Sequence, residues 1–120
     1  DVGAGKTTLV RGLARGMGVT ETVQSPSFTI SRLYSGAHSL QLAHYDFYRL
    51  QDPGIMREEL SEMITDKETV VAIEWGETIE KTLPSDRLIL NISTTRENTR
   101  TINISTGGEI SEYLAKEITL

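Results

Sequence analysis

Apolar residues recur at helical spacing in three parts of the chain. From 6 to 17 they follow one another at intervals of three and four, and Gly16 and Gly18 stand at the end of the segment. This spacing places the apolar side chains on one face of a helix, and glycine commonly ends a helix. The same spacing predicts helices over 55–64 and around 110–114.

Two segments rich in apolar and aromatic residues, 28–34 and 40–46, predict a pair of strands. The link between them contains Gly36, the residue type that a hairpin turn favours, so we expect a β-hairpin. Residues 69–75 contain the run Val-Val-Ala-Ile between polar residues. Its β-branched side chains and short length favour a strand that is buried on both faces, as in a parallel sheet.

Alternating apolar residues predict two more strands toward the C-terminus. They fall at 88–92 and 102–104, on either side of the polar stretch 94–99. Helices and strands therefore alternate along the chain, which predicts an α/β fold with a sheet flanked by helices. The length of 120 residues is that of one domain, so 1–120 is expected to be a single domain.

The composition narrows the class of protein. The chain has no cysteine, which excludes disulfides and thiol nucleophiles, so a bound metal must rely on oxygen or on His38 and His44. The net charge of −5 disfavours nucleic-acid binding by electrostatics alone, because that affinity comes mainly from neutralising phosphates. No apolar run approaches the roughly 18 residues of a membrane span, and no signal peptide is visible. A cytoplasmic protein is therefore expected.

The most specific chemical signal is the segment Gly-Ala-Gly-Lys-Thr-Thr, which leads into the first predicted helix. It matches the last part of the phosphate-binding motif G-x-x-x-x-G-K-[ST]. Backbone N–H groups and the helix N-terminus would bind phosphate oxygens, Lys6 would place a positive charge on the terminal phosphates, and Thr7 would ligate Mg²⁺. The alternative is a glycine turn before an ordinary helix. We favour a nucleotide site formed by Gly3, Ala4, Gly5, Lys6, Thr7 and Thr8.

The start of the chain falls inside this motif. Its first glycine would lie one position before Asp1, and the chain begins with Asp1 where a natural chain begins with Met. We therefore expect an N-terminally truncated fragment that lacks the first strand of the sheet. A hydrophobic strand ending in glycine directly before Asp1 would complete the motif.

Two acidic residues stand at the ends of predicted strands. Glu74 follows the apolar run of 69–75, and Asp46 ends the strand over 40–46. In open α/β sheets, ligands bind at the carboxyl ends of strands, where either acid could hold Mg²⁺ and Glu74 could orient an attacking water. The alternatives are an acid at the solvent end of a strand and an Asp that caps a turn. The nearby His44 is interpreted as a satisfied strand histidine. Arg49 is interpreted as half of a surface ion pair, with a phosphate contact as the alternative.

Two further features allow several interpretations. Residues 25–29, Ser-Pro-Ser-Phe-Thr, follow the first helix, where the metal-sensing segment of a P-loop switch protein would lie. By composition alone they are a solvated loop. Trp75 could cover a nucleotide, anchor an interface or fill the core, and the residues alone leave these alternatives open.

Taken in order, the motifs resemble those of one family. They are the glycine-rich segment, Ser-Pro-Ser-Phe-Thr, His-x-Asp-x-Tyr-Arg from His44 to Arg49, Glu74-Trp75, and Leu83-Pro84. The combination closely resembles the bacterial ATPase family of tRNA threonylcarbamoyladenosine synthesis (the TsaE, or YjeE, family) over nearly the whole chain. The resemblance implies a P-loop NTPase fold with a small mixed sheet, binding of ATP and Mg²⁺, and weak ATP hydrolysis. It also implies action on adenosine 37 of tRNA.

The same resemblance implies partners and residue roles. The expected partners are the threonylcarbamoyl transferase subunit and its paralogous partner, which would hold the tRNA. Carried over residue by residue, it assigns catalysis to Lys6, Asp46 and Glu74, and it assigns Mg²⁺ to Thr7, Asp46 and Glu74. Trp75 becomes an essential residue at the nucleotide, and 25–29 becomes a switch-like segment. Ser27 stands where the family usually has Thr, but the hydroxyl is kept.

Two other functions would use the same loop. A small P-loop metabolite kinase normally needs a lid with arginines and an acceptor pocket, and the chain has no arginine-rich insertion. The other alternative is a non-catalytic nucleotide-binding interaction module. The sequence therefore favours an accessory ATPase of tRNA modification, with these two as alternatives.

Overall fold

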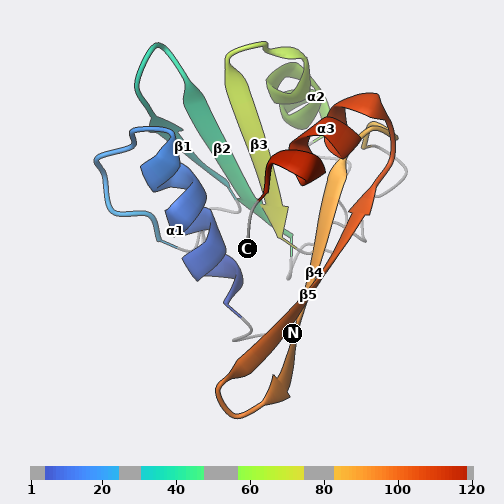
Figure 1. Cartoon of the computed structure of the whole chain (residues 1–120). Helices are drawn as coiled ribbons and strands as arrows, with labels where there is room; N and C mark the ends of the chain where they lie inside the picture. Colours follow the sequence, from blue (N-terminus) through green and yellow to red (C-terminus); the bar gives the residue numbers. More distant parts are fainter. Residues whose placement is uncertain (1–4, 25–30, 48–56, 75–82, 119–120) are drawn as a thin grey trace. The chain divides into compact units, whose positions relative to one another are not determined.

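The computed structural model describes residues 5–24, 31–47, 57–74 and 83–118, and it has the predicted α/β architecture. Figure 1 shows its helices and strands in chain order. The chain forms two compact units: a first unit, Lys6–Glu80, and a second unit, Asp1–Gly5 with Lys81–Leu120. Each has its own sheet, which contains three described strands in the first unit and two in the second. No helix in the described ranges is long and apolar enough to cross a membrane.

The first unit opens with helix α1, Lys6–Gly16, as the spacing predicts. The predicted apolar face is only partly buried: Val10 and Ala14 are buried, whereas Leu9 and Leu13 are each 40% exposed. Gly18 ends the helix in the left-handed conformation, with a φ of 83°. This conformation favours glycine, because an L side chain rarely adopts it.

The predicted hairpin is confirmed, with antiparallel strands β1 (Ser31–Ser35) and β2 (Gln41–Asp46). The expected role of Gly36 in the turn is wrong, because the residues with positive φ are His38 (56°) and Ser39 (65°). Gly36 is needed for space: a Cβ there would lie 2.6 Å from the Met17 carbonyl oxygen. The glycine therefore permits close approach of the hairpin to the end of α1.

Helix α2, Arg57–Thr65, packs against strand β3, Thr69–Glu74, which pairs in parallel with β2. The strand order β1-β2-β3 combines one antiparallel and one parallel pairing, which confirms the mixed sheet. The predicted burial of β3 on both faces is wrong, since Val70 is 38% exposed and the rest of the strand is half-buried. The strand buried on both faces is β2, from Leu42 to Tyr45: Leu42 packs against α1 on one face, and Tyr45 stacks on Phe47 on the other.

Helix α1 covers one face of the three-stranded sheet (Figure 1). Its buried side chains form a core with Tyr34 and Leu42, and Ala72 of β3 packs against the same cluster. The end of α1 lies beside the start of β2, because the Ala37 N–H donates to the Met17 carbonyl at 2.9 Å. α1 therefore runs opposite to β2 and β3, and its first turn lies toward the carboxyl ends of these strands.

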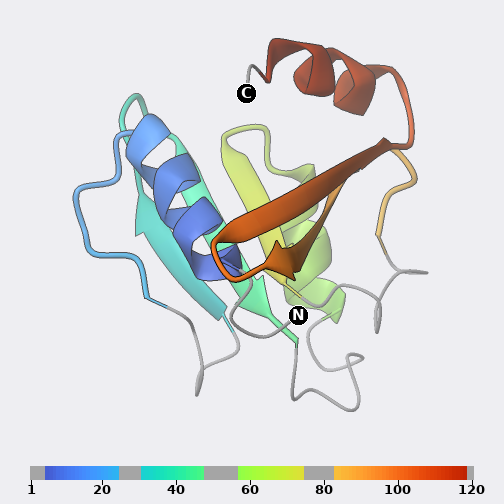
Figure 2. The ribbon, with the colours of Figure 1, turned by 60° about the horizontal axis from the view of Figure 1, so that its bottom comes forward.

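The second unit contains strands β4 (Leu88–Arg96) and β5 (Thr99–Thr106) and helix α3 (Glu109–Glu117), visible in Figure 2. The two predicted strands are confirmed as an antiparallel pair, but they extend through the polar stretch, so that only Glu97 and Asn98 connect them. The C-terminal helix is also confirmed. Its apolar side chains are exposed, however: Ile110 by 71%, Tyr113 by 65% and Leu114 by 50%.

Asp86 caps the start of α3 from the loop before β4. Its carboxylate accepts hydrogen bonds from the N–H groups of Ile110 (3.1 Å) and Ser111 (3.0 Å), which have no partner within the first helical turn. Gly108 permits this approach, because a Cβ there would lie 2.6 Å from the Asp86 carboxyl carbon. The bonds from Ser111, through its side chain and its N–H, and from Ile110 lower the pKa of Asp86.

Candidate functional site

The two acids singled out from the sequence are neighbours in the sheet. Asp46 and Glu74 are the last residues of β2 and β3, and they are partners in the parallel register. The Phe47 N–H donates to the Glu74 carbonyl at 3.1 Å, so the ladder holds through this end. Neighbouring strands lie about 4.8 Å apart, and partners in register share a face of the sheet. The structure therefore brings both carboxylates to one carboxyl edge.

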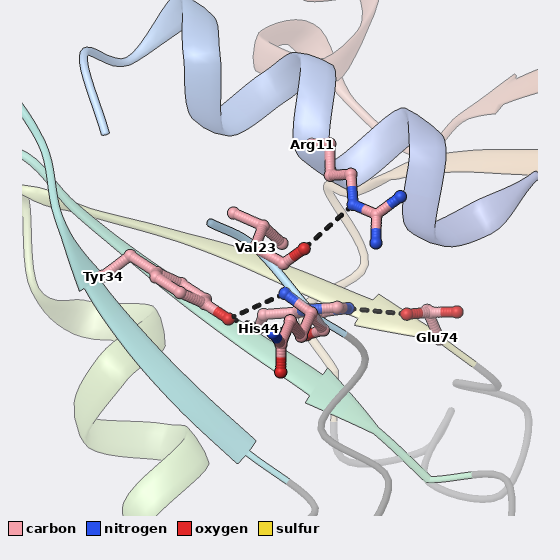
Figure 3. Close-up of polar contacts among 6 residues, drawn as sticks. Arg11, Val23, Tyr34, His44 and Glu74 are labelled. Atoms are coloured by element: carbon pink, nitrogen blue, oxygen red, sulfur yellow. Dashed lines mark hydrogen bonds and ion pairs between the residues drawn. The ribbon is translucent and has the colours of Figure 1, made fainter. Parts of the chain in front are cut away.

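His44 joins this pair through Glu74. Its Nε2 lies 2.6 Å from Oε2 of Glu74, across the β2–β3 ladder (Figure 3). The His44 side chain is fully buried, and that of Glu74 is 10% exposed. The interpretation of His44 as a satisfied strand histidine is half right: Nδ1 has no hydrogen-bond partner among the described residues. His44 thus belongs to the site, although its sequence context suggested an ordinary strand residue.

The shared face of these three residues is the one that α1 covers. Side chains two residues apart on a strand point to the same face, so His44 and Asp46 lie on the face that bears Leu42. Leu42 packs against α1. Because the first turn of α1 lies toward the same end of the sheet, Lys6 and Thr7 lie toward the edge that carries the carboxylates. In Figure 3, α1 passes above His44 and Glu74.

Gly5 has a backbone conformation that favours glycine. It immediately precedes α1 and has a φ of 103°, in the region that favours glycine, and nothing lies within 4 Å of a Cβ built there. Glycine is therefore needed for the backbone conformation and not for space. The other predicted loop residues, Gly3 and Ala4, lie outside the described residues, as do the predicted segment 25–29, Arg49 and Trp75.

Two side chains that the sequence did not single out hold the segment after α1. Arg11 Nε donates to the Val23 carbonyl at 2.9 Å, and the Gln24 N–H donates to the Tyr34 hydroxyl at 3.3 Å (Figure 3). Tyr34 is buried on β1, and Val23 is buried in the core with it. The segment that ends at Gln24 is thus fastened to both α1 and β1. In the sequence, the one feature that could indicate this attachment is a polar residue, Arg11, within the helical segment.

The donor set at the edge suits magnesium. Asp46 and Glu74 offer carboxylate oxygens and Thr7 offers a hydroxyl, which are the hard oxygen ligands that Mg²⁺ prefers. Among the described residues, no three or more His, Asp or Glu side chains form a group able to hold a metal. Mg²⁺ in nucleotide sites is commonly held by one or two carboxylates together with phosphates. The residues present therefore fit a magnesium ion that arrives with a nucleotide.

Tyr45 lies between His44 and Asp46 in strand β2, but its side chain is outside the site. It alternates with His44 and Asp46 along β2, so its side chain points to the opposite face, where its ring stacks on Phe47 with centroids 5.6 Å apart. Its hydroxyl is buried and has no partner among the described residues. Burial, with the nearby charge of Glu59, raises the pKa of Tyr45 to about 12. Tyr45 is therefore a core residue beside the site.

Comparison with known proteins places the chain in one family. Residues 1–102 match the model of the threonylcarbamoyl adenosine biosynthesis protein TsaE. The TsaE protein of Bacillus subtilis is 37% identical over 98% of this chain and 73% of its own length, and that of Streptomyces coelicolor is 42% identical over 77% of this chain and 63% of its own.

The solved structures agree. The crystal structure of Bacillus subtilis YdiB superposes with a TM-score of 0.79 at 35% identity, covering 98% of this chain and 70% of that one. This similarity confirms the fold expected from the motifs. The match to the family model over most of the chain, together with these relatives, shows that the chain belongs to the TsaE family.

Proposed function

We propose that this chain binds ATP with Mg²⁺ and hydrolyses it weakly, as an accessory protein of tRNA threonylcarbamoyladenosine modification. One observation supports the proposal most: Asp46 and Glu74 are register partners at the carboxyl edge of the sheet, on the face covered by α1. The first turn of α1, with Lys6 and Thr7, lies at that same edge. The helix N-terminus proposed to bind phosphate and the two carboxylates proposed to hold the metal therefore come from segments far apart in the sequence.

Each residue has a distinct task in this proposal. The loop residues Gly3 to Gly5 and the first turn of α1 bind phosphate oxygens through backbone N–H groups. Lys6 neutralises charge on the terminal phosphates, and Thr7 and Asp46 hold the metal. Bound Mg²⁺ would offset the charge that develops on the transferred phosphoryl group. Glu74 accepts a hydrogen bond from the attacking water and orients it, either alone or together with the metal.

The proposed partners are the threonylcarbamoyl transferase subunit and its paralogous partner. TsaE family membership places the chain with tRNA modification, and its net charge of −5 makes it a poor direct ligand for tRNA. We infer that the partners hold the tRNA and that nucleotide turnover in this chain, in the cytoplasm, serves them. Trp75, next to Glu74 in sequence, is proposed to link the nucleotide state to the partner complex.

Measurements on the purified protein allow a direct test. Nucleotide binding is measured with and without Mg²⁺, and phosphate release is measured with and without the two partners and tRNA. Modified adenosine is then quantified in digested tRNA by mass spectrometry. The proposal expects Mg²⁺-dependent phosphate release that rises with the partners, and modified tRNA only when ATP and this protein are present. Transfer of phosphate to a metabolite would support the kinase alternative, and binding without turnover would support the interaction module.

A further inference from the structure

We propose that His44 is a positioning residue for Glu74: it holds one carboxylate oxygen so that the other faces the reacting phosphate. This inference rests on the proposed function, in which Glu74 orients the attacking water. His44 does not touch the nucleotide in this proposal. It acts through Glu74, from the middle of the neighbouring strand.

The geometry supports a directed hydrogen bond. An ionised carboxylate can only accept, so Nε2 of His44 carries the hydrogen and donates it to Oε2 of Glu74 at 2.6 Å. The short distance is typical of a hydrogen bond with a charged acceptor. Oε1 of Glu74 has no hydrogen-bond partner among the described residues. One carboxylate oxygen, Oε2, is therefore held by His44, and the other is available.

His44 itself is enclosed by the protein. It is fully buried, between Ala43 and Tyr45, which are also fully buried, in the central strand of the sheet. Glutamate has three side-chain torsions, and an unheld carboxylate near the end of a strand would sample several positions. A donor fixed in the buried strand removes that freedom before substrate arrives. Such preorganisation is how outer residues sharpen a site.

The unpartnered Nδ1 argues that His44 does not serve packing alone. Nδ1 is buried and has no hydrogen-bond partner among the described residues. A buried polar atom without a partner is unfavourable, so an apolar side chain of similar size would fill the same space at lower cost. Within the part of the chain that the structure describes, the one polar contact that the imidazole makes and an apolar residue cannot make is the bond to Glu74.

Two substitutions in the full-length protein separate positioning from packing. His44→Gln keeps an N–H donor near the place of Nε2, and His44→Leu keeps volume without a donor. We expect His44→Leu to lower the rate of ATP hydrolysis by about tenfold while nucleotide affinity stays within about threefold. His44→Gln should restore at least half of the parent rate. Tyr45→Phe, a buried neighbour on the opposite face, should hydrolyse ATP like the parent.

A second measurement uses the nucleotide-free protein. The chain has two histidines, and His38 is exposed in a turn, so it serves as an internal control for the nitrogen and proton NMR spectra of the imidazoles. We expect His44 to show the tautomer with hydrogen on Nε2 and a strongly downfield proton. That proton should move upfield in Glu74→Gln, whereas the His38 signals should not change.

Four results would overturn the proposal. The first is an unchanged rate of ATP hydrolysis in His44→Leu, and the second is an equal loss of that rate in His44→Leu and His44→Gln. The third is a fall in nucleotide affinity as large as the fall in rate. The fourth is a His44 imidazole with hydrogen on Nδ1 alone. Failure of the proposed function is distinguishable from these. It would appear as a parent protein that neither binds nor hydrolyses ATP, even though the NMR spectra still showed the His44–Glu74 bond.

Discussion

Asp46 and Glu74 end two adjacent parallel strands as register partners, so that their carboxylates stand at one edge of the sheet. Two ionised carboxylates at one edge of a sheet repel each other, and a cation between or beside them would offset that repulsion. This is the physical reason for proposing that the pair holds Mg²⁺ carried by a nucleotide. The same edge receives the first turn of α1, so a phosphate group there would meet both the helix N-terminus and the metal.

Lys6 should be required for nucleotide binding. Lys6→Ala removes the fixed positive charge on the terminal phosphates, so we expect ATP affinity to fall by at least about tenfold and hydrolysis to be lost. Isothermal titration calorimetry and phosphate release measure the two effects. Lys67→Ala, at an exposed turn, is the matched control and should behave like the parent. Unchanged affinity and turnover in Lys6→Ala would contradict the assigned phosphate loop.

Glu74 should matter for chemistry more than for binding. Glu74→Gln keeps size but loses the charge that orients water, so hydrolysis should fall by about 100-fold while ATP affinity changes little. Glu68→Gln, at an exposed turn, is the control. Single-turnover phosphate release separates this step from product release. Hydrolysis at the parent rate would show that the catalytic acid lies elsewhere.

Asp46 should act through the metal. In Asp46→Asn one carboxylate at the edge is lost, so the Mg²⁺ concentration that gives half-maximal hydrolysis should rise by about tenfold or more. A magnesium titration of the initial rate measures this shift. If Asp46→Asn required no more Mg²⁺ than the parent, Asp46 would not be a metal residue.

Trp75 should be needed for the tRNA modification and not for nucleotide affinity. An indole has no role in phosphate cleavage, so we expect it to act by packing, where truncation of a buried interface aromatic can cost about 2 kcal/mol. Trp75→Ala should bind ATP within a few-fold of the parent and yet form little modified tRNA over repeated turnovers with the partners. Circular dichroism of the variant checks that it is folded. Modification at the parent rate would identify Trp75 as a plain core aromatic.

Asp86 should make the start of α3 sensitive to acid. Because its pKa is lowered in the folded protein, the unfolded state binds the proton more readily, and the stabilisation from this carboxylate is lost as pH falls below about 3.8. Asp86→Asn should speed hydrogen exchange at the Ile110 and Ser111 amides at neutral pH. In this variant, the protection of the two amides should no longer fall when the pH is lowered. Glu97→Gln, in the β4–β5 turn, is the control. Equal exchange in parent and Asp86→Asn would contradict the cap.

The sequence predicted those elements whose signal is local. The three- and four-residue spacing predicted α1, and alternating apolar residues predicted the β4–β5 pair. The sequence could not say which strand is buried on both faces, because that depends on neighbours supplied by distant segments. The run Val70 to Ile73 correctly predicted a strand, β3, but the strand that is buried on both faces is β2, the middle strand of the sheet.

The site was predictable in its residue types and not in its contacts. Lys6, Asp46 and Glu74 stand out by motif and by position at strand ends. The bond from His44 to Glu74 joins residues 30 apart, and it exists only because the parallel register brings β2 and β3 together. The cap on α3 likewise depends on Asp86, which is 24 residues before Ile110. The organisation of 1–120 as a single domain stays a prediction, as do the roles of 25–29 and Trp75.

The location of the metal and nucleotide tests the central claim most directly. Crystals of the full-length protein grown with ADP and Mn²⁺, an anomalous scatterer that takes the same oxygen ligands as Mg²⁺, would reveal the ion independently of the protein density. The account predicts the ion about 2.1 Å from the Thr7 hydroxyl, in contact with Asp46 or Glu74 directly or through one water, with the phosphates on the first turn of α1. An ion and phosphates bound away from the carboxyl edge of β2 and β3 would contradict it.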